Sequence, residues 1–130
     1  VFSTRKWIIF IGSSVSLVSL ISLALFNEIS FNVAVFLFCT LGFFGMSYPL
    51  MIAHGRSFSP ENLTGRCVTL LNMFAIGGVG IFQFLTGRIF RKLTEVHNNN
   101  HEAYTIIFLF YAAALFLGLI LYLKSKDRLD

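Results

Sequence analysis

The sequence predicts an all-α polytopic membrane protein, with a bundle of four transmembrane helices in a single membrane domain over residues 1–130. Only 12% of the residues are charged, whereas soluble domains carry roughly 25%. The charges cluster between four runs without Asp, Glu, Lys or Arg, at residues 7–26, 31–53, 67–87 and 104–123. Each run would reach ~30 Å as a helix, the thickness of a bilayer's hydrocarbon core. Because lipid cannot pair with backbone polar groups, each run is expected to be helical.

The first two helices are expected at about residues 7–26 and 31–53. The first follows the basic pair Arg5 and Lys6, as a signal peptide would, but it exceeds a signal core of about 7–15 residues and no Ala-x-Ala site follows. A tight turn between the two helices makes them antiparallel neighbours. Pro49 is expected to kink the second helix, because proline removes a backbone hydrogen bond.

The third and fourth helices are expected at about residues 64–90 and 104–123. A polar loop precedes the third helix, and Ser59 followed by Pro60 is typical of a helix start, so a short helix is expected at residues 60–63. Residues 91–102 are expected to form the longest polar connection, with the asparagine run at its centre in water.

The basic residues predict the orientation of the helices. The net charge is +4, but the Lys and Arg residues flank apolar runs and do not line one face, so no nucleic-acid partner is expected. Seven of the basic residues lie at the two chain ends or between the predicted second and third helices: Arg5, Lys6, Arg56, Arg66, Lys124, Lys126 and Arg128. Three lie on the other side: Arg88, Arg91 and Lys92. The positive-inside rule therefore predicts cytoplasmic chain ends in a multi-pass protein, expected in a bacterial inner membrane.

The third helix carries a polar-edged face. At about 100° per residue, Asn72, Val79 and Gln83 fall within roughly 60° of one another, with Thr69 at the margin. Such a face should meet protein or a water-filled cavity, because an unpaired amide in lipid costs several kcal/mol. Asn72, Gln83 and Thr69 are therefore candidates for lining a substrate cavity. Hydrogen bonding to neighbouring helices, worth about 0.6–2 kcal/mol for each amide, is the open alternative.

Small residues recur in the predicted helices, where they let helix backbones approach closely. The residues expected to serve helix packing are Gly77, Gly78, Gly80, Gly87, Gly12, Ser16 and Gly118. A gating bend at the central glycines of the third helix is the alternative.

Several kinds of chemistry are missing from the sequence. No predicted span contains an acidic residue, and no nucleophile–base pair or phosphate-binding glycine loop is present. Cys39 and Cys67 lack metal-ligand spacing and are expected to be small buried hydrophobes. His97 and His101 have no third ligand nearby. No enzyme activity, cofactor or metal is expected.

The segment PENLTGR at residues 60–66, followed by Asn72, the central glycines and Gly87, resembles the loop before helix 11 and helix 11 itself in major facilitator superfamily transporters. The apolar run at residues 108–122 with its basic end is similar to that family's last helix. The acidic start of the family's helix 8–9 loop motif is missing, and Gln83-Phe84 stands where many members have proline.

The resemblance covers the whole chain and implies helices 9–12, the C-terminal third of a longer twelve-helix transporter. It implies alternating-access transport of a small solute, with a coupling ion as a further partner, and association with the preceding helices and the lipid bilayer. Arg56, Glu61, Gly65 and Arg66 would then form cytoplasmic gate contacts. The alternative is a non-transporting four-helix membrane scaffold or accessory subunit.

Overall fold

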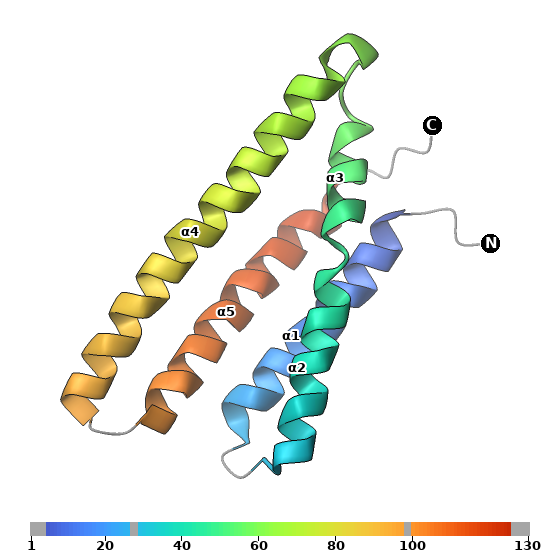
Figure 1. Cartoon of the computed structure of the whole chain (residues 1–130). Coiled ribbons are helices and arrows are strands. Elements are labelled where there is room, and N and C mark those ends of the chain that lie inside the picture. The colour runs from blue at the N-terminus through green and yellow to red at the C-terminus, as the bar shows by residue number, and fades with distance from the viewer. Residues whose placement is uncertain (1–4, 27–28, 98–99, 126–130) are drawn as a thin grey trace.

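The computed structural model describes residues 5–26, 29–97 and 100–125, and all regular structure in these ranges is helical (Figure 1). The helices are α1 (Arg5–Leu25), α2 (Phe31–Gly45), α3 (Tyr48–Arg56), the short 3₁₀ helix η1 (Glu61–Leu63), α4 (Thr64–His97) and α5 (Asn100–Leu123). Four helical segments are long and apolar enough to cross a membrane: Lys6–Leu25, Phe31–Arg56, Glu61–Glu95 and His101–Leu123. The prediction of four membrane-length helices is confirmed.

The helices run up and down in sequence order, and α1 lies between α2 and α5 (Figure 1). α4 packs against α5 along one part of its length and against α3 along another. The core is small: among the residues that the structure describes, the buried apolar ones are Ile9, Ala24, Ala103, Ala112 and Leu119. The three alanines leave the helix backbones room to approach each other closely. Most large apolar side chains of the described residues point outward, as is expected where the surrounding solvent is hydrocarbon.

The second membrane-length segment is interrupted between α2 and α3. Proline has no N–H, so Pro49 cannot donate the helical hydrogen bond to the carbonyl of Gly45. The chain turns at Met46 and Ser47, whose N–H groups donate to the carbonyls of Phe43 and Phe44 at 3.2 and 3.1 Å. Pro49 then stands in the first turn of α3, where its missing N–H costs little. The expected kink is therefore a break, and the helix continues to Arg56, past the expected end at residue 53.

The third predicted helix begins as expected and ends later. Residues 61–63 form η1, which leads directly into α4. α4 has 34 residues and continues to His97, well past the expected end at residue 90. It is thus about 51 Å long, more than a bilayer core requires.

The expected loop over residues 91–102 is instead largely helical, because α4 covers residues 91–97 and α5 begins at Asn100. Arg91 and Glu95 lie four residues apart on the exposed side, with Nε and Oε1 4.0 Å apart, an arrangement that supports a helix in water. Asn98 and Asn99 lie outside the described residues.

Candidate functional site

A hydrogen bond joins α3 to α4 inside the membrane-length segments. The hydroxyl of Tyr48 donates to Oδ1 of Asn72 at 2.5 Å. Five residues earlier on α4, the thiol Sγ of Cys67 lies 3.8 Å from the carbonyl oxygen of Gly55 on α3. Asn72 and Cys67 therefore both lie where α4 contacts α3. Asn72 thus bonds a neighbouring helix, which is one of the two roles that the sequence left open.

A cavity of about 740 Å³ lies between α1, α3, α4 and α5. Its lining residues are Leu20, Met51, Ala75, Gly78, Val79, Phe82, Gln83, Tyr111, Ala114 and Leu115. None of them is charged, and only Gln83 and Tyr111 carry a polar side-chain group. Of the three cavity candidates from the sequence, Gln83 therefore lines this cavity, whereas Asn72 and Thr69 do not. The hydroxyl of Thr69 instead donates to the carbonyl of Gly65 within α4, at 3.0 Å.

The two polar groups of this cavity differ in their hydrogen bonding. The hydroxyl of Tyr111 lies 3.3 Å from Oγ1 of Thr86, a buried residue on α4. Oγ1 of Thr86 also donates within its own helix to the carbonyl of Phe82 at 2.8 Å. The side chain of Gln83 makes no hydrogen bond to any residue that the structure describes. An amide at membrane depth without a partner is costly, so Gln83 is the polar group of the cavity that a ligand could satisfy.

One end of the bundle is joined by polar contacts that the sequence analysis missed. Nζ of Lys6, in the first turn of α1, donates to the carbonyls of Leu123 and Ser125 at 2.8 and 2.6 Å. The buried His54, near the end of α3, has its Nδ1 2.7 Å from the hydroxyl of Tyr122 on α5. The predicted topology places the start of α1, the end of α3 and the end of α5 on the same side of the membrane. This shared side was the signal in the sequence that these ends could contact one another.

The four gate candidates stand apart from these contacts. Arg56, Glu61, Gly65 and Arg66 are exposed, and none of the three charged residues makes an ion pair within the described residues. The structure therefore does not bring them together as a closed gate.

The packing roles expected for small residues differ from helix to helix. Gly12 is buried on α1, and a Cβ there would lie 3.1 Å from Cδ1 of Phe44 on α2. Ser16 is half-buried on the same helix. In contrast, a Cβ would meet no described atom within 4 Å at Gly77, Gly78, Gly80, Gly87 or Gly118. Gly78 lines the cavity between α1, α3, α4 and α5, and a packing role for these five glycines stays a prediction.

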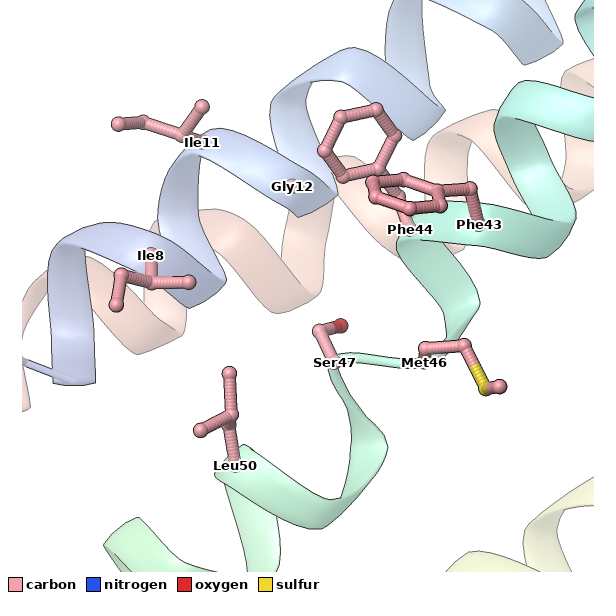
Figure 2. Close-up of a pocket in the computed structure, with 8 residues that line it drawn as sticks. All are labelled: Ile8, Ile11, Gly12, Phe43, Phe44, Met46, Ser47 and Leu50. Atoms are coloured by element: carbon pink, nitrogen blue, oxygen red, sulfur yellow. The ribbon is translucent and has the colours of Figure 1, made fainter.

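A second cavity, of about 400 Å³, lies where α2 gives way to α3 (Figure 2). Ile8 and Ile11 of α1 and Leu50 of α3 border it, and the rings of Phe43 and Phe44 stand beside Gly12. These rings meet edge to face, with centroids 5.2 Å apart. The only polar side chain in its lining is that of Ser47. The cavity is therefore a product of the break at Ser47 and offers little chemistry for a polar ligand.

No group of three potential metal ligands exists among the described residues. The class that this fold defines is an α-helical protein with four helices able to cross a membrane, which is compatible with a multi-pass membrane protein. Comparisons with protein-family models, curated proteins and solved structures gave no match. The resemblance to the major facilitator superfamily therefore rests on the sequence motifs alone.

Proposed function

We propose that this chain forms part of a secondary transporter of the major facilitator type, which moves a small solute across a membrane by alternating access. The observation that carries the proposal is the surface of α4. This helix is apolar enough to cross a membrane, yet it exposes Thr69, Gln83 and the glycines at positions 77 and 80. Polar groups at such depth face a water-filled pathway or other protein in membrane proteins, not lipid.

The position of the large cavity supports the same proposal. Val79, one of its lining residues, lies 13 residues from Arg66 and 9 residues from Arg88. At 1.5 Å per residue these separations are about 20 and about 14 Å, so the cavity lies near the middle of the span. Solute sites of secondary transporters lie near the bilayer midplane and next to interrupted helices, as α2 and α3 are here.

Two-sided accessibility tests the proposal without knowledge of the solute. Gln83→Cys is made with Cys39 and Cys67 replaced by alanine, in the protein as the cell produces it. Under alternating access, a membrane-impermeant thiol reagent should modify residue 83 from either side of the membrane. Phe84→Cys is the matched control, because Phe84 is the neighbouring exposed aromatic and does not line the cavity. Modification of residue 83 from neither side, or from one side only, would favour the scaffold.

A further inference from the structure

We infer that the cavity between α1, α3, α4 and α5 binds an uncharged, largely apolar small molecule whose single hydrogen-bonding carbonyl faces the side-chain amide of Gln83. The inference rests on the proposed function in taking this molecule to be the transported solute. It adds the chemical class of the solute and the residue that orients it.

The dimensions of the cavity fit a small molecule. Its volume of about 740 Å³ falls within the range of about 300–1,000 Å³ that is typical of sites for drug-sized ligands. Residues of four different helices line it, so a ligand there contacts the bundle from several directions. The rings of Phe82 and Tyr111 are stacked at 21° with centroids 6.1 Å apart, and both line the cavity.

The lining selects against charged and highly polar solutes. An ionic ligand would need a counter-charge, and none of the lining residues provides one. Transfer of an unpaired ion into such surroundings is very unfavourable. A sugar would bring many hydroxyl groups to a site where only Gln83 and Tyr111 offer polar side-chain groups. An uncharged and mainly apolar molecule avoids both costs.

The unsatisfied amide of Gln83 favours one polar group on the ligand. Because the hydroxyl of Tyr111 already lies 3.3 Å from Thr86, the free donor in the cavity is the NH₂ group of Gln83. A ligand carbonyl would accept from it. A lipid acyl chain in the same space would leave the amide unpaired, at a cost of several kcal/mol in an apolar medium. A carbonyl-bearing molecule is therefore the better occupant.

Benzophenone has the inferred properties, being uncharged, apolar and equipped with one carbonyl. When illuminated, it also attaches covalently to nearby C–H bonds, including those of methionine. The chain offers an internal reference: Met51 lines the cavity and is 46% exposed, whereas Met73 lies outside the cavity and is 59% exposed on α4. The experiment illuminates the reconstituted full-length protein with benzophenone and measures the ratio of labelled Met51 to labelled Met73 by mass spectrometry.

Two variants with one matched control test the site. Gly78→Leu fills the cavity, because a Cβ at Gly78 meets nothing within 4 Å and the residue lines the cavity. Gly80→Leu is equally open at its Cβ but does not line the cavity, and both changes remove a glycine from the same helix. Gln83→Leu keeps the side-chain bulk and removes the amide donor.

We expect a Met51 to Met73 ratio well above one, its collapse to about one in Gly78→Leu, and no change in Gly80→Leu. Loss of one hydrogen bond in Gln83→Leu should lower the ratio about fivefold. Equal labelling of the two methionines in the unaltered protein would overturn the site, because it would report benzophenone dissolved in lipid. Preferential labelling of Met51 by the anionic 4-benzoylbenzoate would overturn the uncharged class. If residue 83 were accessible from one side of the membrane only while Met51 was still labelled preferentially, the transport proposal would be rejected and the binding site would stand.

Discussion

The phenol of Tyr48 and the amide of Asn72, 24 positions apart in sequence, are joined by a hydrogen bond that holds α3 against α4. Tyr48 follows directly on the break in the second membrane segment, so this bond anchors the short helix α3 on the far side of that break. The arrangement gives Asn72 a partner that a lipid environment could not provide.

Removal of this bond should weaken the association of α3 with α4. Tyr48→Phe should lower the free energy of unfolding by about 0.6–2 kcal/mol, the range for hydrogen bonds between membrane helices. Unfolding in mixed detergent micelles measures it, and a double-mutant cycle with Asn72→Leu isolates the pairwise energy. Tyr104→Phe is the control, because no hydrogen bond of the Tyr104 hydroxyl occurs among the described residues. Strict additivity of Tyr48→Phe and Asn72→Leu would contradict the interaction.

Lys6 should stabilise the end of α5. Its ammonium group donates to the carbonyl of Leu123, the last residue of α5, and to that of Ser125 just beyond it. Lys6→Met should therefore speed amide hydrogen exchange at Lys124 and Ser125 by at least about tenfold, since bonds to charged groups contribute about 1.5–3 kcal/mol. Lys6→Arg should retain most of the protection. Lys92→Met, which removes a cation from an exposed site on α4, should leave the exchange unchanged. An equal rise in exchange in Lys92→Met would show that the loss of any positive charge has this effect, and not the loss of the Lys6 hydrogen bonds.

The four membrane-length helices could be predicted because their signal is local: about 20 residues without charge leave the backbone no state but a helix. The contacts between helices could not. Whether Asn72 contacts Tyr48 or lines a cavity depends on how α4 is rotated about its own axis. A one-sided polar face does not fix this rotation, because the face can point either to a neighbouring helix or to a cavity inside the protein. The extension of α4 past residue 90 was not predicted for a different reason, since polar residues continue a helix in water as readily as they form a loop.

Gly55 leaves little room for a larger side chain where α3 meets α4. A Cβ at Gly55 would lie only 2.7 Å from Cδ1 of Leu71, so Gly55→Ala forces the leucine or the helices to shift. We expect a net loss of at most about 1 kcal/mol in the free energy of unfolding, because the contacted atom is the end of a flexible side chain and alanine favours helix. Gly65→Ala should instead be neutral or stabilising, because nothing lies within 4 Å and alanine favours helix.

A smaller side chain at position 71 tests whether the contact with Leu71 causes the loss of stability in Gly55→Ala. Leu71→Ala removes the atoms that the new Cβ would meet, so the loss from Gly55→Ala should be smaller in the Leu71→Ala background than in the unaltered protein. The same detergent unfolding assay measures both. An equal loss in the two backgrounds would assign the glycine requirement to the backbone and not to the contact.

The two ends of α4 should lie on opposite sides of the membrane. Glu61 precedes this helix and Glu95 lies near its end, and both side chains are exposed. Single cysteines at these positions, with Cys39 and Cys67 replaced by alanine, can be tested with a membrane-impermeant maleimide in right-side-out and inverted vesicles. The seven basic residues at the predicted inner side predict that Glu61→Cys reacts only from the cytoplasm and Glu95→Cys only from outside. Reaction of both from one side would contradict a membrane-crossing α4, whereas the reverse pattern would keep the crossing and invert the orientation. Lys92→Gln with Arg91→Gln removes two of the three opposing charges and should leave the pattern unchanged, because it strengthens the predicted bias.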